Sequence, residues 1–119
     1  MCVSRETAFK QHKEFENVFL RLGIDIKWQS VEPEHPDQVA TRDFGVNTSG
    51  GVLIGNFRYV DNEGDTELAI EALEKLKEPI IGQVKNGALE GGDCWYLDKH
   101  TMVIGTGNRT NLEGIKEAE

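Results

Sequence analysis

Amphipathic helical segments and short apolar runs alternate along the chain, and this alternation is typical of an α/β fold. The first helix is expected over residues 5–22, with Ser4 as its cap and Gly23 as its stop. The second helix is expected to be capped by Asp65, to run to about Lys77 and to end before Pro79. Each helix carries one apolar stripe that we expect to be buried. The stripes are Ala8, His12, Phe15, Phe19 and Leu22 in the first helix, and Ala69, Ala72, Leu73 and Leu76 in the second.

Between the helices lie short segments with the alternating or β-branched character of strands. These are residues 24–28, 39–41, 52–57, 80–84, 94–97 and 101–105. Gly50-Gly51 predicts a hairpin between Val46 and the 52–57 segment, and a second hairpin is expected around residues 98–100. The pattern Thr110-Asn111-Leu112-Glu113 has the form of a capping box, which predicts a third helix. The predicted order is helix, three strands, helix, three strands and helix, with mixed rather than purely parallel strands.

Length and charge restrict the classes of partner. The chain has 119 residues and a formal net charge of −8, which fits one soluble domain over residues 1–119. No apolar run approaches the ~20 residues of a membrane span, and the acidic balance disfavours nucleic acid and anionic membranes. Cys2 and Cys94 do not make a disulfide framework, so a cytoplasmic location is expected.

Three motifs are candidates for a functional site, and each also has a purely structural explanation. They are Thr41-Arg42-Asp43, Glu90-Gly91-Gly92-Asp93 and Gly105-Thr106-Gly107-Asn108-Arg109-Thr110-Asn111. Paired glycines followed by aspartate make a good turn, because glycine accepts positive φ and aspartate satisfies turn amides. A Gly-rich junction between a strand and a helix is common in α/β proteins that bind no phosphate.

In this order and separation, the motifs resemble the N-terminal part of the guanidino-group-modifying enzymes. That superfamily includes arginine deiminases, agmatine deiminases, dimethylarginine dimethylaminohydrolases and amidinotransferases. The resemblance also rests on Ala8, Gln11, His12, Phe15, Leu22-Gly23, Gly50-Gly51-Val52 and Gly114-Ile115. It implies the pentein fold, a five-bladed α/β propeller, of which this chain would form about two ββαβ-type blades. The chemistry it implies is attack of a cysteine on a guanidinium carbon.

The resemblance assigns roles to four residues. Asp43 matches the aspartate that binds the guanidinium, and Glu90 matches the glutamate that orients the catalytic histidine. Asp93 matches an aspartate near the far end of the substrate. Arg109 matches an arginine near the substrate-binding loop, and a structural ion pair is an equal alternative for it. The carboxylates of Asp43 and Glu90 should then converge on one rim, with Asp93 close by.

The chain also departs from the family pattern. The family's paired arginines after the second strand are absent from the 61–65 segment, and Arg58 stands too early to be equated with either of them. No metal site or cofactor is expected. The family's late cysteine is absent, and so is its His-x-Asp motif beyond the middle of the chain, where His100 is followed by Thr101. Cys94 is expected to be a core residue, His12 to pack on the buried helix face, and His35 and His100 to be solvated.

These features predict an inactive chain that corresponds to a fragment, a truncated product or one half of a split protein. An alternative is a non-catalytic module that binds a small guanidino or amine ligand, and a further alternative is an interaction module of the same fold. Apolar flanks that other blades would cover predict a homodimer or higher oligomer, or association with a missing C-terminal half.

Overall fold

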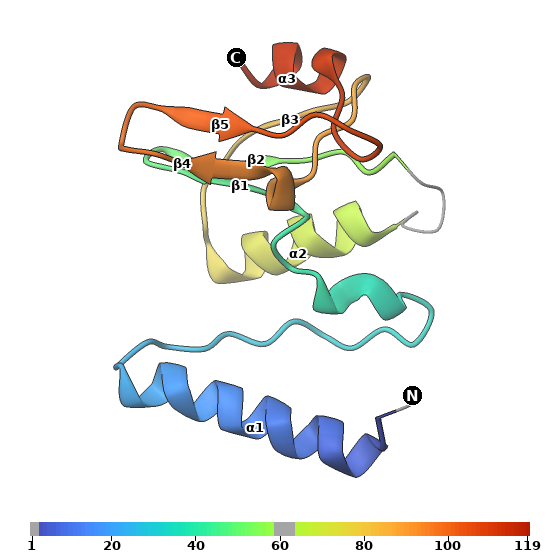
Figure 1. Cartoon of the computed structure of the whole chain (residues 1–119), viewed down its shortest axis with the longest axis vertical. Helices are drawn as coiled ribbons and strands as arrows, with labels where there is room; N and C mark the ends of the chain where they lie inside the picture. The colour runs from blue at the N-terminus through green and yellow to red at the C-terminus, as the bar shows by residue number, and fades with distance from the viewer. Residues whose placement is uncertain (1–2, 59–63) are drawn as a thin grey trace.

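The computed structural model describes residues 3–58 and 64–119 of the chain. Its helices and strands follow one another in the order shown in Figure 1. They are α1 (Arg5–Arg21), η1 (Pro36–Val39), β1 (Gly45–Thr48), β2 (Gly51–Ile54), α2 (Asp65–Leu76), β3 (Ile80–Gln83), η3 (Gly91–Asp93), β4 (Cys94–Tyr96), β5 (Met102–Ile104) and α3 (Leu112–Ala118). Cys2 and most of the 61–65 segment lie outside the described residues.

Two small sheets form the centre of the molecule, and α2 and α3 lie on opposite sides of them (Figure 1). In the first sheet β2 is central: it pairs antiparallel with β1, where Val46 faces Leu53, and parallel with β3. In the second sheet β4 and β5 form an antiparallel hairpin in which Trp95 faces Val103. The mixed strand directions and both hairpins confirm the sequence predictions.

The buried core lies between the two sheets and α3. Val46, Val84, Leu89 and Cys94 form its centre, which draws on both sheets and on the chain that enters η3. Leu53, Met102, Ile104, Ile115 and Ala118 pack around these four residues. The core therefore fixes the 84–94 segment, which includes the Glu90-Gly91-Gly92-Asp93 motif.

Helix α1 forms as predicted, but its predicted buried stripe is wrong. The Ser4 hydroxyl accepts a hydrogen bond from the Thr7 N–H at 3.2 Å, as expected of a cap. Along the stripe, however, Phe15 is 60% and Leu22 69% exposed, and the buried residue of the helix is Glu16. Figure 1 shows why: α1 lies apart from the sheets, and the 22–35 segment runs between α1 and the other elements.

Two predicted strands do not form, and two helix caps move by one residue. Residues 24–28 pair with no strand in the described part of the chain. Residues 39–41 belong instead to the end of η1 and the following turn. Gly64, with φ 88°, is the cap of α2, so Asp65 is its first residue. The cap of α3 is Asn111, whose side chain accepts from the Gly114 N–H at 2.8 Å.

The helices of the described ranges include none with the length and apolar character needed to cross a membrane.

Candidate functional site

Glu90 is a fully buried carboxylate within the 84–94 segment that the core fixes. Its side chain is 2% exposed, and Oε2 lies 2.9 Å from a guanidinium nitrogen of Arg109. Its other oxygen, Oε1, is also buried, and among the described residues it has no hydrogen-bond partner. Buried polar atoms are nearly always hydrogen-bonded. Glu90 therefore carries one oxygen that is available for a donor from outside the described residues.

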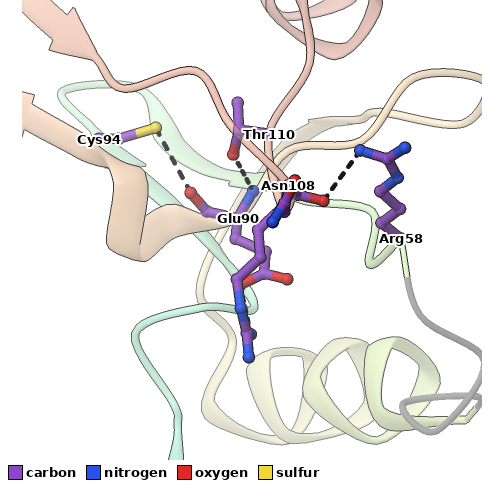
Figure 2. A network of polar contacts seen from close by, with 6 residues as sticks. Arg58, Glu90, Cys94, Asn108 and Thr110 are labelled. Carbon is purple, nitrogen blue, oxygen red and sulfur yellow. Dashed lines mark hydrogen bonds and ion pairs between the residues drawn. The ribbon is translucent and has the colours of Figure 1, made fainter.

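The Arg109-Thr110-Asn111 motif holds the segment that carries Glu90. The Thr110 hydroxyl accepts from the Glu90 N–H at 3.1 Å, a contact visible in Figure 2. Asn111 pairs with Ala88 twice: its N–H donates to the Ala88 carbonyl at 3.0 Å, and its Oδ1 accepts from the Ala88 N–H at 3.1 Å. Together with the Arg109 ion pair, these contacts attach three consecutive residues of the motif to the 88–90 segment.

The two glycines after Glu90 serve close approach and not positive φ. Neither Gly91 nor Gly92 has a positive φ, contrary to the turn explanation offered by the sequence. A Cβ at Gly91 would overlap the carbonyl oxygens of Arg42 and Gly45, and a Cβ at Gly92 would overlap Oδ1 of Asp43. Glycine is needed at Gly91 so that the η3 turn can lie against the backbone of the 42–45 segment, whereas the atom beside Gly92 is the end of the Asp43 side chain.

Asp43 is half-buried and lies beside this turn. Its carbonyl accepts from the Gly91 N–H at 3.1 Å, and its Oδ1 lies against Gly92. Asp43 follows η1 and a turn, in which its N–H donates to the Ala40 carbonyl at 2.9 Å. The expected position at the end of a strand is therefore wrong, because Pro36 begins a 3₁₀ helix where a strand was predicted.

Asp43 and Arg109 both line a small cavity of about 140 Å³. Its walls are Asp37, Ala40, Asp43, Phe57 and Arg109. Pockets for drug-sized ligands measure roughly 300–1,000 Å³, so this one suits a single functional group. Two carboxylates and one guanidinium line the cavity, and the guanidinium is paired with a third carboxylate, that of Glu90, so acidic groups outnumber basic ones at this site.

Asp37 was not predicted from the sequence. It lies two residues after His35 in a Pro-rich loop, and no motif singled it out. The available signal was the Pro-Asp pair, which favours a turn, but nothing in that pair indicated that the turn borders a cavity.

Asp93 and Arg58 lie near the site without lining the cavity. Asp93 is half-buried, and its carbonyl accepts from the Gly105 N–H at 2.9 Å. Arg58 donates to the Asn108 carbonyl at 3.0 Å, so its guanidinium lies beside the loop that carries Arg109 (Figure 2).

The cysteine at this site is a core residue, as the sequence predicted. Cys94 is 4% exposed, and its thiol donates to the Glu90 carbonyl at 3.7 Å. Burial raises the pKa of the Cys94 thiol, the charge of Asp93 raises it further, and Arg42 lowers it. The thiolate, which is the nucleophilic form, is therefore disfavoured.

The histidines are placed differently from the predictions in two of three cases. His12 is exposed rather than packed in a core; it lies 3.4 Å from Glu16 and its ring contacts Trp28. His35 is half-buried rather than solvated, and it pairs with Asp65. His100 is exposed at the hairpin, as expected. Within residues 3–58 and 64–119, no histidine lines the small cavity.

Comparison with known proteins identifies a family. A family model described as N,N dimethylarginine dimethylhydrolase, eukaryotic, matches residues 2–119. The uncharacterized protein ZK1307.1 of Caenorhabditis elegans is 24% identical over 110 residues, which cover 92% of this chain and 39% of that protein.

Solved structures show the same fold. A dimethylarginine dimethylaminohydrolase adduct with 4-chloro-2-hydroxymethylpyridine matches with a TM-score of 0.86 and 24% identity, over 97% of this chain and 46% of that chain. A cysteine-to-serine mutant of the Pseudomonas aeruginosa enzyme, complexed with citrulline, also matches with a TM-score of 0.86 and 24% identity, over 97% and 45% of the two chains. The chain thus spans less than half the length of these relatives, and it has the predicted partial pentein fold.

Proposed function

Because the chain belongs to the eukaryotic N,N-dimethylarginine dimethylhydrolase family, we propose that its acidic cavity binds the guanidinium group of a methylated arginine or a related guanidino compound. The observation that carries the proposal is that two carboxylates, Asp37 and Asp43, line one small cavity together with Arg109. The similar Pseudomonas aeruginosa enzyme was solved in complex with citrulline, and this supports a ligand of similar shape for the present chain.

The chemistry of the cavity fits a planar cation. A guanidinium presents paired N–H donors that a carboxylate accepts two at a time, and such charge-assisted bonds are among the strongest in proteins. Asp43 is the carboxylate we assign to this contact. The Arg109 side chain would not repel the ligand strongly, because Glu90 lies 2.9 Å from it.

Glu90 is proposed to orient a histidine that this chain does not supply at the site. Its buried Oε1 has no partner among the described residues, whereas its Oε2 is held by Arg109. A carboxylate fixed in this way can accept an imidazole N–H and so select one tautomer of the ring. Asp93 is proposed to lie toward the far end of the substrate.

The isolated chain is proposed to bind without turnover. Hydrolysis of dimethylarginine by a cysteine would form a bond from sulfur to the guanidinium carbon and break the bond to the dimethylamino nitrogen, which leaves as protonated dimethylamine. Water would then displace the sulfur and leave citrulline. That reaction needs a nucleophile beside a base, and no described cysteine or histidine lines the cavity. Incubation with dimethylarginine should therefore yield no citrulline. Turnover that disappears in Cys94→Ser would contradict this proposal.

Calorimetric titration tests the binding. Asymmetric dimethylarginine should bind, and citrulline, which has a similar shape but no charge, should bind more weakly. Asp43→Asn removes one charged acceptor and should weaken dimethylarginine binding by about 10-fold or more. Glu74→Gln removes the same charge from an exposed position on α2 and should leave the affinity unchanged. Equal binding by Asp43→Asn and the unsubstituted chain would overturn the assignment.

A further inference from the structure

His35 connects the wall of the acidic cavity to the start of α2. Its Nδ1 lies 2.6 Å from Oδ1 of Asp65, a contact that spans thirty residues of sequence. The side chain of Asp65 is 1% exposed. An ionised carboxylate only accepts hydrogen bonds, so the N–H of His35 is the donor. The bond joins a buried charge to a half-buried ring, which makes it a strong attachment.

Gly64 makes room for this contact. A Cβ at Gly64 would come within 2.7 Å of Cε1 of the His35 ring. Gly64 also has a φ of +88°, which side-chain-bearing residues rarely adopt. The glycine before α2 therefore meets two requirements at once: it caps the helix and it admits the imidazole.

A series of backbone hydrogen bonds runs from His35 to the cavity. His35 precedes η1, and its carbonyl accepts from the Gln38 N–H at 3.2 Å. The Ala40 N–H donates to Asp37, and the Asp43 N–H donates to Ala40, each at 2.9 Å. Three of the five wall residues, Asp37, Ala40 and Asp43, thus belong to the segment that begins at His35. In Figure 1 this turquoise segment lies beneath the first half of α2.

The hydrogen bonds of the Gln38 side chain stay within the loop. The Gln38 side chain accepts from the Glu32 N–H at 2.9 Å and donates to the Ser30 carbonyl at 3.2 Å. These contacts shape the loop but do not attach it to a helix or sheet. The His35–Asp65 contact does so, because Asp65 belongs to α2.

We propose that His35 is a positioning residue for the guanidinium cavity: by holding η1 against α2, it sets where Asp37 and Asp43 stand. This inference rests on the proposed function, since the effect on affinity requires that the cavity bind a guanidinium. The effect on the wall itself does not require a ligand.

The test compares three variants by calorimetry and amide hydrogen exchange. His35→Ala should weaken dimethylarginine binding about 10-fold, by loss of one charge-assisted bond, and should speed exchange of the Ala40 and Asp43 amides. His35→Asn should restore both, because its amide places a donor close to the position of Nδ1. His100→Ala removes an exposed histidine and should change neither.

The outcomes separate the two proposals. Failure of the unsubstituted chain to bind would contradict the proposed function, whereas amide exchange in the unliganded chain would still decide the role of His35. Unchanged exchange and unchanged affinity in His35→Ala would overturn the inference. Should His35→Ala fail to fold, Asp65→Asn removes the charge of the acceptor, and the same increase in exchange at Ala40 and Asp43 is expected.

Discussion

The guanidinium of Arg109 lies 2.9 Å from Oε2 of Glu90, although the Arg109 side chain is 57% exposed and the Glu90 side chain only 2%. The pair therefore joins a surface cation to a buried anion. A buried charge that loses its partner is strongly destabilising. Arg109 thus has a structural role in neutralising Glu90, in addition to its place in the cavity wall.

Removing the cation of this pair should destabilise the fold. Arg109→Met should lower the free energy of unfolding by about 1–3 kcal/mol, because it leaves a buried carboxylate without this partner. Adding Glu90→Gln to Arg109→Met should recover part of the loss, since the buried charge is then gone. Urea denaturation measures both variants. Equal stability of Arg109→Met and the unsubstituted chain would show that Glu90 does not depend on this pair.

The Thr110 hydroxyl should be required for the position of Glu90. Thr110 is fully buried and accepts from the Glu90 N–H. Thr110→Val keeps the shape but leaves that N–H unsatisfied, which should cost about 1–3 kcal/mol of unfolding free energy. Thr110→Ser retains the hydroxyl and should lose less. The account would be contradicted if Thr110→Val and Thr110→Ser had the same free energy of unfolding in urea.

Stability in acid should depend on Glu117 of α3. The N–H groups of Lys85, Asn86 and Gly87 donate to its carboxylate at 2.7, 3.0 and 2.9 Å. These bonds, with that of Lys85 the largest cause, hold the pKa of Glu117 below its ordinary value. A lowered folded pKa stabilises the fold above the unfolded pKa of about 4.3, and this contribution disappears as pH falls through the folded pKa.

Glu117→Gln should therefore reduce the loss of thermal stability between neutral pH and acid. Glu113→Gln, an exposed change in the same helix, is the matched control and should keep the original acid dependence. Melting temperatures measured as a function of pH would reveal the difference. If the melting temperature of Glu117→Gln fell with pH in parallel with that of the unsubstituted chain, the hydrogen bonds to the Glu117 carboxylate would be ruled out as a source of acid sensitivity.

We expect the isolated chain to self-associate through exposed apolar side chains. Phe9 and Val18 of α1, and Trp95 of β4, are exposed. The strand β2 contributes little to such a surface, because Ile54 is fully buried. A stable dimer would bury roughly 1,200–2,000 Å². Sedimentation velocity at micromolar concentration should show association that rises with concentration, and a monomer at all concentrations would refute it.

The sequence predicted the elements whose signals are local. The first hairpin follows from Gly50-Gly51, the second follows from two apolar runs separated by residues 98–100, and α1, α2 and α3 follow from caps and stops. The α1 stripe could not be interpreted correctly, because periodicity shows that a helix is amphipathic but not that a layer lies against its apolar face. Residues 39–41 were misassigned because Pro36 three residues earlier begins a 3₁₀ helix.

The candidate site was predicted where motifs mark it and missed where contacts are long-range. Asp43, Glu90 and Arg109 stand in motifs that resemble a known family. Asp37 and His35 stand in a loop without a motif, and their surroundings depend on how η1 packs beside α2. The His35–Asp65 contact links two residues that are thirty positions apart, and no local pattern encodes such a pair.

The central claim is that a guanidinium occupies the cavity between Asp43 and Arg109, and amide NMR with added dimethylarginine tests it most directly. In a ¹⁵N-labelled chain, the amides of Asp43, Gly92 and Arg109 should shift and saturate together, while amides of α1 and of the β4–β5 hairpin tip should not move. The same titration of Asp43→Asn should shift these amides little at the same ligand concentration. Saturable shifts confined to other parts of the molecule, or none at all, would contradict the account.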